Sequence, residues 1–144
     1  MVDQIVSWFP AGGAAGMGHI VGEKAVDPQE WFFSAHFYQD PVIPGSLGLE
    51  AFLQLLKVVA QKKWGEDVLT TWEVEPIAMD RLHRWWYRGQ VIPSHSRVRV
   101  EASLTEIRED ERERLLGADG FVSVDGRIIY ELRDFALRLR RSLT

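Results

Sequence analysis

The sequence predicts an α+β domain in which one long, buried helix packs against about six mostly antiparallel strands. Three observations support this fold class. Polar side chains in residues 46–64 recur with spacings of four, three and four, which places them on one stripe of a helix. Residues 97–107 alternate between apolar and polar types, as a strand with one buried face does. Asp125 and Gly126 lie between two apolar runs, the signal of a tight hairpin that joins antiparallel strands.

Length and composition restrict the class of protein. The 144 residues fit one domain, and 46% hydrophobic with 26% charged residues is close to the globular average. The chain has no cysteine, which excludes disulfides and thiolate-bound metals. A net charge of −4 lacks the basic excess of a nucleic-acid-binding protein, so we expect no nucleic-acid partner. Aromatic residues make up 11%, which calls for a deep core, a partner surface or an apolar pocket.

The elements before the helix follow in order. Residues 2–9 and 19–26 predict two strands, and residues 11–18, with four glycines, predict the flexible connection between them. Residues 31–37 (WFFSAHF) form a dense apolar patch. The loop at residues 38–45 has two prolines and a glycine that restrict its shape.

The elements after the helix are mostly strands. Residues 70–74 and 84–92 predict short strands on either side of a loop insertion at residues 75–83. Residues 108–114 form a charged turn, and residues 128–132 form the second arm of the hairpin.

The last strand ends in basic residues. Phe135, Leu137 and Leu139 alternate with Arg138 and Arg140, which predicts that these two arginines and the following Arg141 lie on the solvated side. The alternative is a docking patch for an acidic carrier protein or a phosphate group.

Three residues form a candidate set for proton chemistry beside a carbonyl group. Gly45 precedes the helix, where free backbone N–H groups can polarise a carbonyl. His36 can remove the adjacent proton, and Glu50, 14 positions later, can donate one if its surroundings are apolar. The residues alone leave simpler interpretations open: a packed core histidine, a solvated carboxylate and a turn glycine.

Several segments together resemble a known family. These are WFF-x-x-HF, DPV-x-PG and S-LGLEA-x-x-QLL within residues 31–56, YRGQVIP at 87–93 and ADGFVSVDGRIIY at 118–130. They resemble the β-hydroxyacyl–acyl-carrier-protein dehydratases of the hotdog fold, in particular the β-hydroxydecanoyl dehydratase/isomerase branch and the dehydratase domains of polyunsaturated fatty acid and polyketide synthases. The resemblance implies a hotdog fold, one long central helix wrapped by a mostly antiparallel sheet of six to seven strands. It also implies one dehydratase domain over residues 1–144, in a form cut from a larger synthase or shortened.

The resemblance implies a role for each matching position. His36 corresponds to the base at C2, and the backbone carbonyl of Val42 fixes the histidine tautomer. The N–H of Gly45 binds the thioester carbonyl, Glu50 protonates the leaving hydroxyl, and Gln54 orients that carboxylate. The family uses no cofactor, and the scattered histidines show no metal-ligand spacing.

The expected activity is removal of water from a (3R)-3-hydroxyacyl thioester to give a trans-2-enoyl thioester. The substrate is carried on the phosphopantetheine of an acyl carrier protein. Glu50 comes from a partner, so the active unit is a homodimer or a pair of hotdog domains. Phe33, Phe37 and Phe52 are expected to line the acyl tunnel, and we expect a cytoplasmic protein with no membrane association.

Other functions of the same fold stay open. They are a dehydratase/isomerase, a thioesterase and a non-catalytic acyl-binding module. The isomerase branch usually has Asp where this chain has Glu50, which puts isomerisation in doubt.

Overall fold

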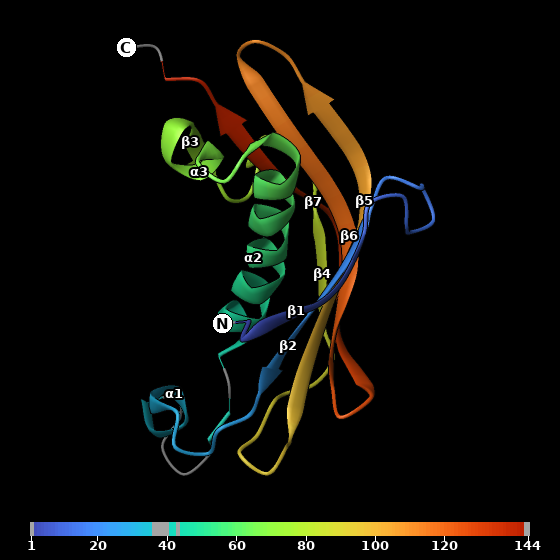
Figure 1. The fold of residues 1–144 in the computed structure, drawn as a ribbon. Helices are drawn as coiled ribbons and strands as arrows, with labels where there is room; N and C mark the ends of the chain where they lie inside the picture. Colours follow the sequence, from blue (N-terminus) through green and yellow to red (C-terminus); the bar gives the residue numbers. More distant parts are fainter. Residues whose placement is uncertain (1, 36–40, 43, 143–144) are drawn as a thin grey trace.

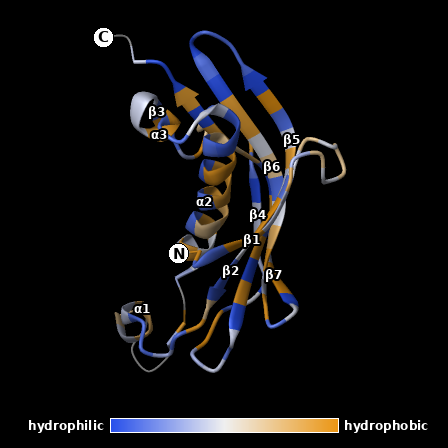
Figure 2. Cartoon of the chain, in the orientation of Figure 1, coloured by the Kyte–Doolittle hydropathy of each residue, from blue (hydrophilic) through white to orange (hydrophobic). Residues whose placement is uncertain are grey.

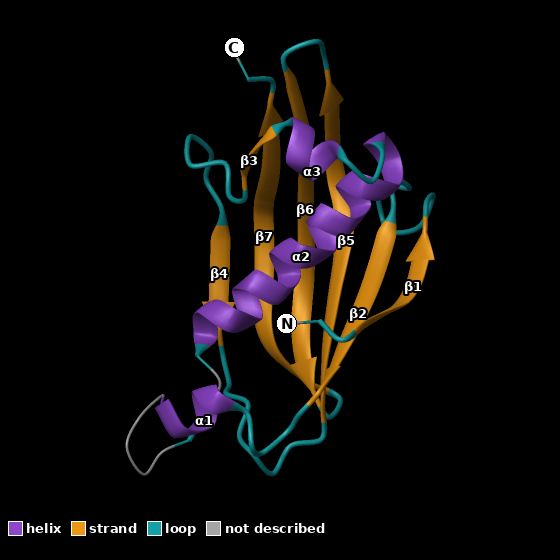
Figure 3. Cartoon of the chain, turned by 60° about the vertical axis from the view of Figure 1, so that its left-hand side comes forward, coloured by secondary structure: helices purple, strands orange, loops and turns teal. Residues whose placement is uncertain are grey.

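A curved antiparallel sheet packs along one long helix in the computed structural model, which describes residues 2–35, 41–42 and 44–142 (Figure 1). The sheet has seven strands in the order β1-β2-β5-β6-β7-β3, and β4 also pairs with β7. The helix α2 crosses the concave face of the sheet, and α1 lies beyond its N-terminal end (Figure 3). The strands are β1 (Gln4–Phe9), β2 (His19–Ala25), β3 (Glu73–Glu75), β4 (Arg84–Tyr87), β5 (Arg97–Glu109), β6 (Glu113–Val124) and β7 (Arg127–Arg140). The helices are α1 (Trp31–Ala35), α2 (Gly45–Trp64) and α3 (Val68–Thr71).

The central helix α2 forms because apolar side chains cover most of its circumference. Seven of its residues are buried, including Phe52, Leu55, Leu56 and Val59, and they meet the apolar face of the sheet. Hydrophobic and hydrophilic residues separate on α2 and alternate along the long strands (Figure 2). The helix ends at Gly65, whose φ of 105° suits glycine.

The sheet follows the alternation of the sequence. The inward residues of β5, Val98, Val100, Ala102 and Leu104, are all buried. The hairpin between β6 and β7 turns at Asp125 and Gly126, whose φ values of 48° and 85° fit the two central positions of a type I′ turn. The predicted α+β class, with a long central helix and a seven-stranded antiparallel sheet, is confirmed.

Two predicted strands differ from the structure. Residues 70–74 do not form one strand, because Val68–Thr71 is the helical turn α3 and the strand β3 begins at Glu73. The hydroxyls of Thr70 and Thr71 both donate to the carbonyl of Asp67, a local bond that competes with strand pairing. The predicted strand at 84–92 ends at Tyr87, and the chain then passes Ile129 at Gly89.

The prediction that Arg138 is solvated is also wrong. Its side chain is 6% exposed, and the loop between β3 and β4 passes over it. The guanidinium lies 2.8 Å from Asp80, 3.3 Å from Glu75 and 3.4 Å from Glu113. Arg138 is therefore a buried ion-pair centre that fixes this loop on β7.

Among the helices in the described ranges, none has the length and apolar character needed to cross a membrane.

Candidate functional site

The predicted site residues lie around the start of α2. His36 and Phe37 fall outside the described residues, so the structure places neither of them. The described chain leads up to them through α1, in which Phe32 and Phe33 are buried. It continues after them with Val42, which is 1% exposed, and enters α2 at Gly45. The predicted base therefore belongs to a segment whose two flanks are anchored in the core.

Gly45 is the first residue of α2 and touches the aromatic side chains of β4. A Cβ atom at this position would lie 2.9 Å from Cε2 of Tyr87 and 3.5 Å from the Trp85 ring. Backbone N–H groups in the first turn of a helix lack intrahelical acceptors, and the helix dipole gives this end a partial positive charge. Such a position suits a carbonyl oxygen that gains negative charge.

Three aromatic rings pack together beside this helix start. The ring centroids of Trp85, Tyr87 and Tyr130 lie 5.0–6.0 Å apart, and Tyr130 is 2% exposed. Burial raises the pKa of Tyr130 above its usual value, and the neighbouring Tyr87 phenol raises it further. The cluster gives the helix start a mostly apolar wall that carries the phenols of Tyr87 and Tyr130.

A narrow cavity of about 20 Å³ lies beneath the first turns of α2. Its volume admits about one water molecule. The walls are apolar apart from Lys24 and the Tyr130 phenol, and include Leu47, Gly48, Ala51, Val91, Val98, Val100, Val122 and Ile129. In one copy of the chain, this space between helix and sheet has no room for a long acyl group.

Glu50 lies on the polar stripe of α2, away from the core. Its side chain is 40% exposed, and its carboxylate lies 3.5 Å from the ammonium of Lys57. A carboxyl group acts as a proton donor near neutral pH when its surroundings are apolar. One copy of the chain leaves Glu50 partly in solvent, so a further surface has to cover it for that role.

Gln54, one turn after Glu50, contacts the N-terminal segment. Its Oε1 accepts a hydrogen bond of 3.1 Å from the backbone N–H of Val2. It also lines a pocket of about 380 Å³ between β1 and α2, together with Asp3, Ile5 and Lys57. The predicted role of Gln54 in orienting Glu50 stays a prediction.

Of the three phenylalanines predicted to line the acyl tunnel, Phe33 and Phe52 are part of the core, and Phe37 lies outside the described residues. Phe33 is 6% exposed and its ring centroid lies 4.9 Å from that of Phe32. Phe52 is fully buried and packs edge to face on Phe135, at 5.9 Å. Phe52 thereby packs α2 against β7, and contact of Phe33 and Phe52 with an acyl chain stays a prediction.

The sequence patterns assign no role to three polar residues near the start of α2, namely Tyr87, Tyr130 and Lys24. Tyr87 and Tyr130 occur in the segments that carry the family resemblance, but their contacts with Gly45 and Gly48 cross between distant parts of the chain. Lys24 is different, since the alternation of residues 19–26 already places it on the same side as Ile20 and Gly22.

Comparisons with known proteins agree with this architecture. The model of the FabA-like domain family matches residues 1–133. One component of the polyunsaturated fatty acid synthase from Thraustochytrium sp. is 32% identical over 130 residues, which cover 88% of this chain and 8% of that protein. The chain therefore spans a small part of this relative.

Solved structures share the fold at low sequence identity. The dehydratase heterocomplex ApeI:P from Xenorhabdus doucetiae matches with a TM-score of 0.61 and 13% identity, over 99% of this chain and 83% of that one. A mutant of the thioesterase PA1618 from Pseudomonas aeruginosa matches with a TM-score of 0.54 and 11% identity, over 85% and 74%. The same fold thus occurs in a dehydratase complex and in a thioesterase.

The family match over 133 residues, the sheet wrapped on a long helix and the helix start at Gly45 lead to one conclusion: this chain belongs to the FabA-like domain family of the hotdog fold.

Proposed function

We propose that this domain removes water from (3R)-3-hydroxyacyl thioesters carried on an acyl carrier protein and releases trans-2-enoyl thioesters. The observation that carries the proposal is the start of α2 at Gly45, set between an aromatic wall and the segment that bears His36. The match to the FabA-like family and to a component of a polyunsaturated fatty acid synthase supports the same reaction.

The proposed elimination uses three groups of the protein. The N–H of Gly45 binds the thioester oxygen and makes the C2 proton more acidic. His36 takes that proton, the C3–O bond breaks, and Glu50 gives its proton to the departing hydroxyl, which leaves as water. The electrons of the C2–H bond form the new double bond, and a later transfer from histidine to carboxylate restores both groups.

The active unit in this proposal is a pair of hotdog domains. β4 bonds to β7 along one edge and exposes Trp85, Trp86 and Tyr87 by 37–43% at the border of the sheet. An edge strand with large aromatic side chains favours pairing with a second strand, and an antiparallel pair of β4 strands has the two-fold symmetry of a homodimer. A partner seated there would also exclude water near the start of α2.

Elimination is tested with a series of 3-hydroxyacyl thioesters and the variants His36→Ala and His95→Ala. We expect the wild type and H95A to form the enoyl thioester, and H36A to lose at least about 10²-fold in rate with an unchanged melting temperature. Retention of near-wild-type elimination by H36A contradicts the proposal.

The products separate the remaining reactions of this fold. A trans-2-enoyl thioester supports dehydration alone, and a cis-3-enoyl thioester indicates an added isomerisation. Free acid as the main product indicates a thioesterase, the activity named for one structural neighbour. Binding of acyl thioesters without any product indicates a non-catalytic module.

A further inference from the structure

Lys24 occupies a position on the core face of the sheet. Along β2, Ile20, Gly22 and Lys24 pair with Ala102, Val100 and Val98 of β5, and the other five residues are all buried. Directly paired residues of antiparallel strands point to the same side of the sheet. The Lys24 side chain is accordingly 12% exposed.

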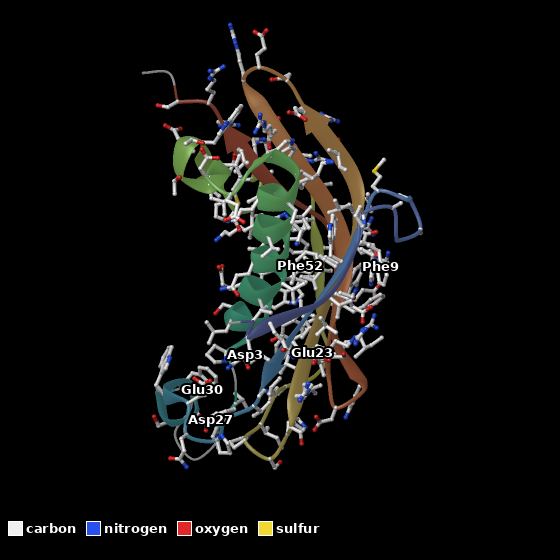
Figure 4. All side chains as sticks on the ribbon, viewed as in Figure 1. Asp3, Phe9, Glu23, Asp27, Glu30 and Phe52 are labelled. Carbon is white, nitrogen blue, oxygen red and sulfur yellow. The ribbon has the colours of Figure 1, made fainter. Side chains whose placement is uncertain are left out.

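The aliphatic stem and the ammonium group of Lys24 have different surroundings. The stem lines the narrow cavity next to Leu47, Gly48 and Ala51, in the first turns of α2. The ammonium lies beyond the apolar cavity walls, 2.7 Å from Glu30 Oε1 and 3.8 Å from Asp3 Oδ1. Glu30 directly precedes α1, and Asp3 accepts a hydrogen bond from the N–H of Ala25. Figure 4 shows Asp3 and Glu30 at the same end of the molecule.

If this position served packing alone, a lysine would cost more free energy of burial than an apolar residue. Apolar residues occupy the equivalent inward places on β5, and an ammonium loses hydration when its stem is buried. What Lys24 adds is a charged link between the sheet and Glu30, the residue directly before α1. A five-residue helix is not stable alone and depends on such links and on the burial of Phe32 and Phe33.

We propose that Lys24 is a positioning residue: its ion pair with Glu30 fixes α1, the helix that precedes the proposed base in the chain, relative to the first turns of α2 at the proposed thioester site. The inference rests on the proposed elimination for its effect on catalysis. Its structural part, the anchoring of α1, is independent of any activity.

The test compares Lys24→Met, Lys24→Arg and Glu30→Gln with Lys63→Met, which changes an exposed lysine of α2. In K24M and E30Q we expect faster hydrogen exchange of the α1 amides and a kcat lowered about tenfold, with KM within about twofold. We expect K24R to keep the wild-type hydrogen exchange of α1 and the wild-type kcat, because a guanidinium also reaches the Glu30 carboxylate. K63M behaves as the wild type, and melting temperatures show that each variant is folded.

Each outcome decides the inference. Unchanged exchange of α1 in K24M overturns it, whatever the activity. Faster exchange with unchanged kcat overturns the positioning role and leaves Lys24 a structural link. A wild type without elimination activity refutes the proposed function instead, while the exchange measurement still decides whether Lys24 anchors α1.

Discussion

The ring of Tyr130 lies directly against Gly48, so that a Cβ atom at position 48 would overlap its Cε2 atom. Tyr130 is buried in β7, and Gly48 belongs to the first turn of α2. The absence of a side chain at position 48 is what lets the helix start approach the sheet at the proposed site.

Substitution of Gly48 therefore tests the packing of the helix start. Gly48→Ala forces the helix away from a fully packed ring, and we expect a loss of about 1–3 kcal/mol in the free energy of unfolding. The control is Ser46→Ala, two positions earlier and exposed, which should change stability by less than about 0.5 kcal/mol. Urea unfolding of both variants measures the difference, and equal stabilities would contradict the contact.

Arg138 provides a second prediction, on the loop between β3 and β4. Arg138→Met leaves Glu75, Asp80 and Glu113 without their shared cation, and these carboxylates are partly exposed. We expect a loss of about 1–3 kcal/mol, because solvent screens the remaining charges in part. Arg141→Met, at an exposed position, is the matched control. Thermal unfolding that is identical for R138M and R141M would show that the ion pairs contribute nothing.

The hairpin at Asp125 predicts a dependence of stability on pH. Hydrogen bonds from the backbone N–H groups of Ser96 and Arg97 hold the pKa of the Asp125 carboxyl below its usual value. A carboxyl with a lowered pKa in the folded state stabilises the fold above its unfolded pKa and loses this contribution as the pH falls.

The measurement is the melting temperature of the wild type and Asp125→Asn between about pH 7 and about pH 3. We expect the wild type to be more stable at neutral pH and the difference to shrink as the pH falls. A difference that stays constant over this range would contradict the assigned role of the Asp125 charge.

Local patterns were sufficient for most of the fold. The stripe of α2, the alternation of β5 and the turn at Asp125 each depend on neighbouring residues, so the sequence predicts them directly. Arg138 shows the limit of this approach. Its alternation places it correctly on the outer face, but its burial depends on a loop about 60 residues earlier in the chain.

The sequence predicts which residues belong to the candidate site, but it does not predict the contacts that surround them. Gly45 starts the helix as expected, whereas its contact with Tyr87 joins two distant segments that no local pattern relates. Glu50 lies on the polar stripe, as its spacing indicated, and the environment that would keep it protonated belongs to a second copy in the proposed dimer. His36 and Phe37 lie outside the described residues, so their predicted roles depend on experiment.

Mixing two inactive variants tests the central claim most directly, namely that His36 of one copy works with Glu50 of another. His36→Ala and Glu50→Gln are each purified, and the two chains are also co-expressed with different tags, so that the mixed dimer can be isolated. Each variant alone should lack elimination activity. Each mixed dimer has one intact site out of two, so the isolated mixed dimer should have about half of the wild-type rate; random assembly makes half of the dimers mixed, so the unseparated co-expressed sample should have about a quarter. A co-expressed sample as inactive as the separate variants would contradict a site shared between two copies.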